Sequence, residues 1–178
     1  MKSKIISVNR ECPAQLVPDG TPITIKKDSF VTLTQSLGGA YTVLLNGNMA
    51  RVDGTDADAL GFEPIVIEFE QPKGTSDDKA VMESNVWVAM SAVYDPEMPV
   101  NIVDLGLIYD CKITDNTVVI SMTLTAPACG MGPVLVNDVK YKVGLVPNVE
   151  SVEVDLVLDP PWSREMMTEE AQLELGLF

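Results

Sequence analysis

Histidine is absent from this chain of 178 residues. Its absence excludes Ser-His-Asp and Cys-His catalysis, together with every metal site that uses an imidazole ligand. Any metal chemistry in this protein therefore has to use thiolate, carboxylate, backbone oxygen or inorganic sulfide as ligands.

Cysteines are few, and long apolar runs are missing. Cys12, Cys111 and Cys129 are widely separated and odd in number, so they form neither a CxxC pair nor a disulfide framework. We therefore expect reduced thiols and a cytoplasmic location. No stretch approaches the roughly 18 consecutive apolar residues that span a bilayer, and residues 1–10 lack the pattern of a secretory signal.

Basic residues are also scarce, because 12 Lys and Arg stand against 26 Asp and Glu, giving a formal net charge of −14. Such a field repels phosphate backbones and anionic lipids, so we expect neither nucleic acid nor a membrane as a partner. A basic protein or a cationic cargo would suit it better, although the acidic excess could equally serve solubility. With 46% hydrophobic and 21% charged residues, the chain has the composition of a folded protein.

The first part of the chain, residues 1–72, is predicted to be a β-rich module. Short apolar runs at 23–25, 30–33, 41–45 and 65–69 are separated by Gly, Pro, Asn and Asp. Asn46-Gly47 between two of the runs predicts a β-hairpin, because a type I′ turn needs positive φ at both central residues. The expected form is a small β-barrel or β-sandwich.

A linker at residues 71–76 leads to a predicted helix that begins with Ser76 or Asp77 as its N-cap and runs to Tyr94. Pro96 would end it, and Met82, Val86, Ala89 and Val93 would form its apolar face. The period then changes to two, predicting strands at 107–113 and 118–124, joined by a turn at Asp115-Asn116.

A second helix is predicted from Pro133 to about Val143, since proline suits the first helical position. Its buried residues would be Leu135, Val139 and Val143. Alternating apolar residues at 152, 154, 156 and 158 predict a third strand, and a short acidic helix runs from about Thr168 to Gly176. Residues 77–178 are thus predicted to form a compact α/β domain with a sheet covered on one face, and the whole chain belongs to the α+β class.

Three loops at the ends of these elements are the candidates for binding chemistry: residues 95–100, 125–133 and 159–162. Cys129 precedes a helix, whose positive end favours a thiolate, and a thiolate is the ligand that soft metals and sulfide clusters require. A carboxylate close by would oppose this effect. The alternative is that Cys129 is an inert small residue in a tight loop.

The other candidate residues also have two interpretations each. Asp95 and Glu97 could be an acid/base pair or hard metal ligands, or they could form a polar turn after the helix. Asp104 could stabilise a turn, and Trp162 could be a hydrophobic plug or an anchor for a partner. Cys111 shares a strand face with apolar residues, so we expect it to pack in the core.

Residues 95–109, DPEMPVNIVDLGLIY, resemble the signature of the metal–sulfur cluster biosynthetic domain family. Residues 125–132, with a single cysteine, are similar to the second motif of that family, and Asp159-Pro160-Pro161-Trp162 resembles the third. The β-rich first part and the Cys-Gly-Met-Gly form look like the SufT-type branch, associated with the SUF system. The resemblance implies a role in iron–sulfur cluster assembly, with Asp95, Glu97, Asp104 and Cys129 at the site, supported by Thr125, Gly130 and Trp162.

The leading hypothesis is an accessory factor that handles an iron–sulfur cluster or iron transiently through Cys129, between the assembly machinery and client apoproteins. One cysteine cannot supply the four ligands of a stable cluster, so binding would be labile, shared across a homodimer, or completed by a partner or small thiol. The alternative is a metal-free adaptor that docks clients onto the machinery. A metal-dependent hydrolase is the third hypothesis, but carboxylates alone form a weak catalytic set, and we expect no self-contained enzyme.

Overall fold

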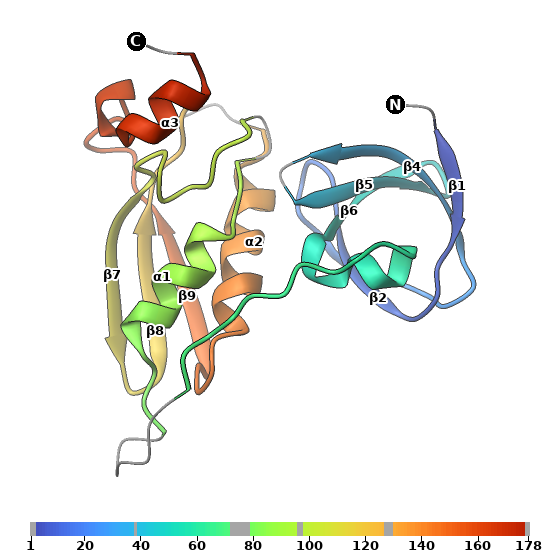
Figure 1. Ribbon diagram of the computed structural model, residues 1–178, viewed down its shortest axis with the longest axis horizontal. Helices are drawn as coiled ribbons and strands as arrows, with labels where there is room; N and C mark the ends of the chain where they lie inside the picture. Colours follow the sequence, from blue (N-terminus) through green and yellow to red (C-terminus); the bar gives the residue numbers. More distant parts are fainter. Residues whose placement is uncertain (1–2, 38, 72–78, 96–97, 127–129, 177–178) are drawn as a thin grey trace. The chain divides into compact units, whose positions relative to one another are not determined.

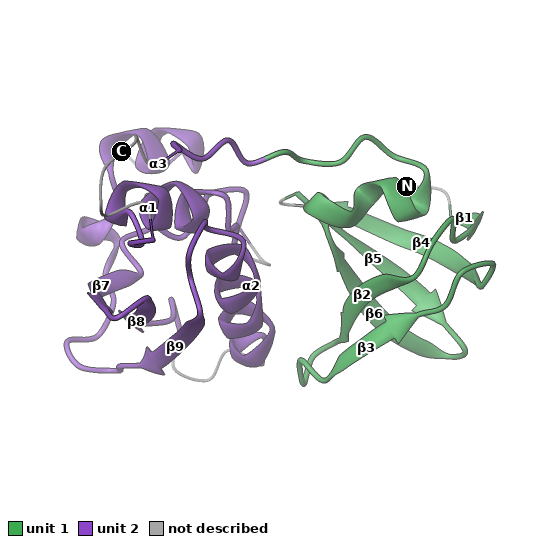
Figure 2. Ribbon diagram, turned by 90° about the horizontal axis from the view of Figure 1, so that it is seen from below, with its two compact units in different colours: residues 1–66 green, residues 67–178 purple. Residues whose placement is uncertain are grey.

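The computed structural model describes residues 3–37, 39–71, 79–95, 98–126 and 130–176 (Figure 1). The chain divides into two compact units, residues 1–66 and residues 67–178 (Figure 2). The first is built from strands, and the second combines helices with a smaller sheet, which confirms the predicted α+β class. Within the ranges given above, no helix is both long and apolar enough to cross a membrane.

The first unit is a single antiparallel sheet of six strands in the order β1-β4-β5-β6-β2-β3, followed by a 3-10 helix, Gly54–Leu60. The strands are β1 Lys4–Ser7, β2 Cys12–Leu16, β3 Pro22–Ile25, β4 Phe30–Leu37, β5 Ala40–Leu45 and β6 Asn48–Asp53. The sheet curls around one apolar core, to which Val8, Val43 and Val52 contribute fully buried side chains (Figure 1). A curled single sheet is closer to the expected barrel than to a sandwich of two sheets.

Turn chemistry explains the predicted hairpin, whereas one predicted strand is wrong. Asn46 and Gly47 have φ of 50° and 85°, and they join β5 to β6 as the Asn-Gly signal predicts. Residues 65–69 form no strand. The backbone hydrogen bonds at the two ends of this segment go to partners that belong to no β-sheet. Ile65 N donates to Gly54 O at 2.8 Å, and the buried Asn85 side chain bonds both backbone groups of Glu70.

The second unit is a three-stranded sheet in the order β7-β8-β9 with helices on one face (Figure 2). Its elements are α1 Glu83–Ser91, β7 Ile108–Thr114, β8 Thr117–Met122, α2 Gly132–Gly144, β9 Ser151–Leu156, the 3-10 turn Arg164–Met166, and α3 Glu169–Glu174. β7 and β8 are antiparallel, while β8 and β9 are parallel and joined through α2. The core between sheet and helices confirms the predicted burial of Leu135, Val139 and Val143.

The boundaries of the first predicted helix are wrong. Ser76 and Asp77 lie outside the described residues, but residues 79–82 are not helical and α1 begins only at Glu83. The helix ends at Ser91, well before Pro96, because the chain turns away to form an antiparallel bridge between Tyr94 and Asn101. Pairing with a later segment therefore ends the helix before the proline can.

The remaining elements agree with the sequence more closely. Asp115 and Asn116 have φ of 48° and 65°, which makes the predicted turn between β7 and β8. Val152 and Val154 of β9 pack on the core as predicted. Leu156 and Leu158 are 45% and 54% exposed, so the expected alternation fails at the end of this edge strand.

The middle of β8 should be the part of the second unit most sensitive to truncation. Ile120 is fully buried between sheet and helices. We expect Ile120→Ala to lower the free energy of unfolding by about 3 kcal/mol, because lost transfer energy and the residual cavity both contribute. The neighbouring Val119 lies on the other face, half-buried, and Val119→Ala should cost less than about 1 kcal/mol. Equal losses in urea denaturation would contradict this assignment of the two faces.

Candidate functional site

The described parts of the three candidate loops lie at one edge of the sheet in the second unit (Figure 1). β8 and β9 are parallel, and their last residues, Met122 and Leu156, are paired. β7 is antiparallel to β8, and its first residue Ile108 pairs with the same Met122. Residues 101–107, 123–131 and 157–163 therefore enter or leave the sheet at this edge, here called the carboxyl edge. Ligands of α/β proteins commonly bind where parallel strands end.

The first loop, residues 95–100, is closed at its base by backbone hydrogen bonds. Asp95 N donates to Val100 O at 3.2 Å, just beyond the bridge between Tyr94 and Asn101. Asp95 itself is buried, with 5% of its surface exposed. Glu97 lies outside the described residues. One of the two predicted carboxylates is thus held in a fixed, buried position beside the carboxyl edge.

Asp104 belongs to a compact turn, residues 101–107, that follows this loop. Asn101 Oδ1 accepts hydrogen bonds from the N–H groups of Val103 and Asp104, each at 3.0 Å. Asn101 Nδ2 donates to Asp104 Oδ2 at 2.8 Å. The Asp104 carboxylate therefore takes part in stabilising a turn, which favours that interpretation over a ligand role.

Trp162 in the third loop packs inward, whereas residues 159–161 are exposed. The Trp162 indole is half-buried against the core, and its Nε1–H donates to Leu105 O at 2.7 Å. Tyr109 OH donates to Pro160 O at 2.6 Å. Because the polar atom of the indole is already used within the domain, the geometry favours a plug over an anchor that projects toward a partner.

The second loop is described on both sides of Cys129, which itself lies outside the described residues. Thr125 is half-buried, and Gly130 is exposed with open space around its α-carbon. α2 begins at Gly132 with a proline in its first turn and without a capping side chain. The loop thus leads from the buried end of β8 directly into a helix N-terminus at the carboxyl edge.

The two described cysteines are poor thiolate donors. Burial, and then the nearby carboxylates of Glu83 and Asp110, raise the pKa of the Cys111 thiol to about 11. Burial, with a smaller contribution from Asp56, likewise raises the pKa of Cys12 to about 11. Cys111 packs against the core as predicted. Among the residues that the structure describes, no three Cys, Asp or Glu side chains are grouped closely enough to hold a metal ion.

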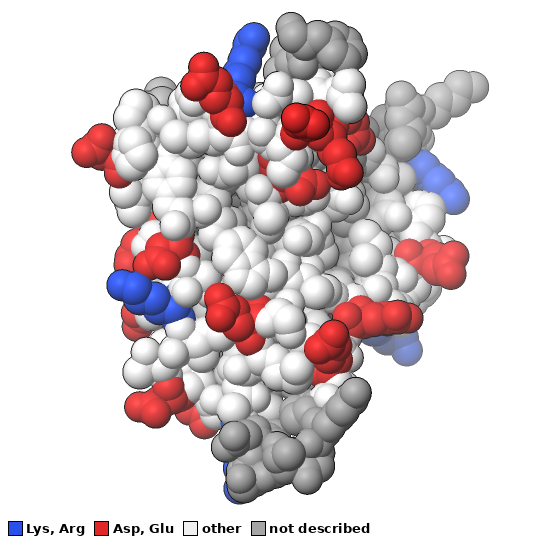
Figure 3. Space-filling view, turned by 60° about the vertical axis from the view of Figure 1, so that its left-hand side comes forward, with Lys and Arg blue, Asp and Glu red and all other residues white. Residues whose placement is uncertain are grey.

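The acidic charge is concentrated in the second unit. Residues 1–66 contain six Lys and Arg against seven Asp and Glu, whereas residues 67–178 contain six against nineteen. Figure 3, which brings the β7 side of the second unit forward, shows acidic side chains around an uncharged area, with few basic ones among them. Any electrostatic attraction of a cationic cargo or a basic partner therefore comes from the unit that contains the three loops.

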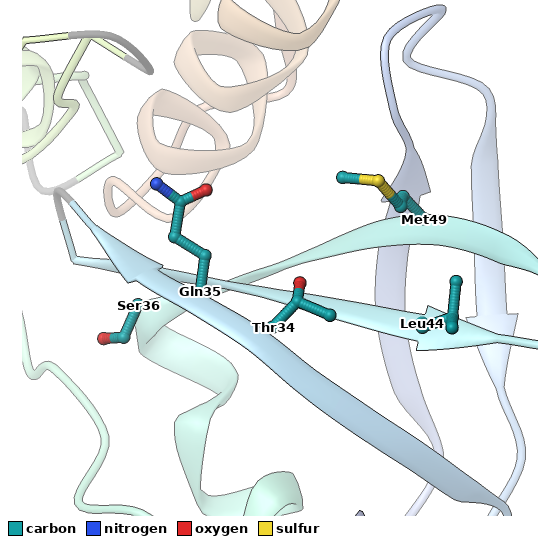
Figure 4. Close-up of a pocket in the computed structure, with 5 residues that line it drawn as sticks. All are labelled: Thr34, Gln35, Ser36, Leu44 and Met49. Carbon is teal, nitrogen blue, oxygen red and sulfur yellow. The ribbon is translucent and has the colours of Figure 1, made fainter. Parts of the chain in front are cut away.

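The outer face of the first unit has a different character that the sequence analysis did not identify. The strand register places Ile5, Thr32, Leu44 and Met49 in one row across β1, β4, β5 and β6. Ile5 is 72% exposed and Met49 is 45% exposed. An uncharged hollow of about 540 Å³ lies at one end of this row (Figure 4), and its lining residues are Thr34, Gln35, Ser36, Leu44 and Met49. The signal in the sequence was apolar residues on both faces of β5 and β6.

Residues 83–156 match the family model described as iron–sulfur cluster assembly protein. An Fe-S protein maturation auxiliary factor of Porphyromonas gingivalis is 46% identical over 95 residues, which cover 53% of this chain and 90% of the relative. This chain belongs to the iron–sulfur cluster assembly protein family. The Fe-S protein maturation auxiliary factor SufT of Staphylococcus aureus is 40% identical over 86 residues, covering 48% of this chain and 98% of the relative, which supports the SufT type.

A solved structure of similar form comes from Thermotoga maritima, where a conserved hypothetical protein is 35% identical with a TM-score of 0.51. The match covers 56% of this chain and 98% of that one. The family members therefore match about half of this chain, and the family model lies wholly within the second unit. The first unit is an addition to the part that defines the family.

Gly106 is predicted to be irreplaceable in the turn at the carboxyl edge. Its φ is +75°, and a Cβ at this position would overlap the Met166 carbonyl oxygen. We expect Gly106→Ala to cost at least about 2 kcal/mol of stability in chemical denaturation, from the left-handed backbone and the clash together. Gly144→Ala is the control, because a Cβ there meets no atom within 4 Å. A Gly106→Ala protein as stable as the control would show that the two segments are not in contact.

Cys111 should be slow to react with alkylating agents. With a pKa raised from 9.0 to about 11, its thiolate fraction at pH 8 is on the order of a hundredfold below that of an unperturbed thiol. Alkylation by iodoacetamide in a Cys12→Ser/Cys129→Ser background should be correspondingly slow. Glu83→Gln removes a negative charge that opposes ionisation, so the pKa should fall and the rate at pH 8 should rise. An unchanged rate would exclude Glu83 as a cause of the shift.

Proposed function

We propose that this protein is an accessory factor in iron–sulfur cluster assembly, which matures or delivers clusters to client proteins through a labile site at Cys129. The observation that carries the proposal is the convergence of the described parts of the three family motifs at one edge of the sheet, in a chain whose relatives are named Fe-S protein maturation auxiliary factors. The assembly function is assigned to residues 77–178. A cluster is cargo in this proposal, bound and then released.

The chemistry of the donors supports a transient site. Cys111 and Cys12 have raised pKa values, so their thiols stay protonated at neutral pH. Cys129 precedes the N-terminus of α2, where the helix dipole favours a thiolate. Asp95 and Glu97 would shape or polarise the same site. Since one thiolate is too few for a stable cluster, a second copy of the chain, a partner protein or a small thiol would complete it.

The wider setting is proposed on the same basis. Partners would be the iron–sulfur assembly machinery and client apoproteins, met in the cytoplasm, and the protein would act without enzymatic turnover of its own. A relative in Synechocystis, 33% identical over 81 residues that cover 46% of this chain and 23% of that protein, is named iron–sulfur cluster carrier protein. The acidic second unit suits partners with basic surfaces.

A second candidate function is a metal-free adaptor that docks clients onto the assembly machinery. The exposed apolar row on the first unit favours it, since exposed apolar side chains gathered on one face are typical of interaction surfaces. In this case the first unit would matter more than Cys129. The two candidates differ in whether the isolated protein binds iron and sulfide.

Anaerobic reconstitution with ferrous iron and sulfide separates the two candidates. We expect the wild type to acquire visible absorption with matching iron and sulfide stoichiometry, and Cys129→Ser to lose both, because a serine hydroxyl is a poor ligand for soft iron–sulfide. Cys111→Ser is the matched control and should retain the cluster. Loss in both variants would point to unfolding or to a different site. A wild type that binds no iron would refute the carrier and leave the adaptor.

A further inference from the structure

The turn of residues 101–107 is hydrogen-bonded to the segments that precede the first two loops. Ile102 N donates to Val93 O at 2.9 Å, which ties the turn to the chain that leads into residues 95–100. Thr123 N donates to Leu107 O at 2.8 Å, which ties it to the end of β8. The turn is therefore a fixed connection between the first loop and the start of the second.

The same turn presents two carbonyl groups to residues 159–168, which comprise the third loop and the segment that leads to α3. Thr168 N donates to Asp104 O at 2.9 Å, and Trp162 Nε1 donates to Leu105 O at 2.7 Å. The two donors, Trp162 and Thr168, lie at the two ends of a short segment, so both ends of residues 162–168 are held against the turn. Of the two, the indole contact is made by a side chain, and it can be removed without altering the backbone.

Tyr109 holds the same segment from the side of the sheet. Its OH donates to Pro160 O at 2.6 Å and lies 3.6 Å from Met166 Sδ. Tyr109 stands at the start of β7, where the register with β8 shifts between Ile108 and Asp110. Tyr109, whose hydroxyl contacts the third loop, thus lies within this β-bulge-like irregularity of the strand.

We propose that Tyr109 and Trp162 are positioning residues of the cargo site. They hold residues 159–168 against the turn, and the turn fixes the base of the first loop, where Asp95 is buried. The inference rests on the proposed function and extends it, because it assigns cargo retention partly to two residues that act through others. Neither side chain is assigned as a ligand.

Phenylalanine is the informative substitution at both positions. At Tyr109 it keeps the ring and removes only the hydroxyl, so Pro160 O loses its side-chain partner. At Trp162 it removes the indole N–H that Leu105 O accepts, together with part of the ring, and Trp87→Phe controls for the loss of ring area. The chain also offers matched controls. Trp87 Nε1 makes a longer contact of 3.4 Å, to Glu83 on the exposed side of α1, and Tyr41 stacks on Phe62 in the first unit.

The first measurement is amide hydrogen exchange on the protein without cargo. We expect Tyr109→Phe and Trp162→Phe each to speed exchange about five- to tenfold at the amides of Asp95, Ile102 and Thr168, the amount that one net hydrogen bond provides. Trp87→Phe and Tyr41→Phe should leave these amides unchanged. Unchanged exchange in Tyr109→Phe and Trp162→Phe would show that these two donors do not hold the loops, and the proposal would be wrong.

The second measurement is the rate at which EDTA removes iron from the reconstituted protein. We expect about five- to tenfold faster loss from either variant, with wild-type iron stoichiometry at the start. The double variant should lose iron more slowly than the product of the two single effects predicts, because both donors act on one segment. Independent, multiplying effects would contradict a shared segment.

The outcomes separate the positioning role from the proposed function. Faster exchange with wild-type iron loss would make the two donors merely structural and would overturn the positioning role alone. A wild type that holds no iron would overturn the proposed function, and the positioning role with it. Faster exchange together with faster iron loss, at a melting temperature within about 5 °C of the wild type, would support the proposal.

Discussion

The side chain of Asn101 is the constraint on which the carboxyl edge depends. Its carbonyl oxygen accepts two backbone N–H groups and its amide donates to Asp104, so one side chain folds the turn that follows it. The backbone can then reverse through Gly106 at positive φ, and consecutive carbonyls become available to a distant segment. A polar turn of this kind fixes the backbone conformation beyond the end of a sheet, where the hydrogen bonds between strands no longer do so.

The two units divide physical properties between them. The second has the family motifs and nearly all of the excess negative charge, whereas the first is close to neutral and exposes apolar side chains on its outer face. Long-range attraction and short-range apolar contact are different contributions to recognition: the former mainly changes association rates, and the latter mainly changes how long a complex lasts. Because the negative charge and the exposed apolar side chains lie on separate units, a mutation can change the association rate or the lifetime of a complex without changing the other.

The sequence predicted the helices and strands that a local pattern of residues specifies. It missed the boundaries and arrangements that depend on pairing between distant segments of the chain. β8 and α2 were predicted because their apolar residues keep the period of one element from end to end. Residues 65–69 are an apolar run typical of a strand, but their backbone pairs with no strand. α1 starts later and ends earlier than predicted, and the chain after it pairs through the bridge between Tyr94 and Asn101. The motifs located the three loops, but their meeting at one edge depends on parallel pairing between β8 and β9, which no local pattern contains. Asn101 followed by Asp104 was the readable signal for the turn.

The crossover through α2 also sets an order of assembly. Translation proceeds from the amino end, so residues 159–168 are made after both of the other loops and after β9. β9 can pair with β8 only after α2, which lies between them in the sequence, has been synthesised, and long-range parallel pairing of this kind is slow. The last segment to reach the carboxyl edge is therefore the one that secures it. A partly synthesised chain would present residues 125–133 before residues 159–168 are made, and would leave the proposed iron-binding residues less well held on the ribosome than in the finished protein.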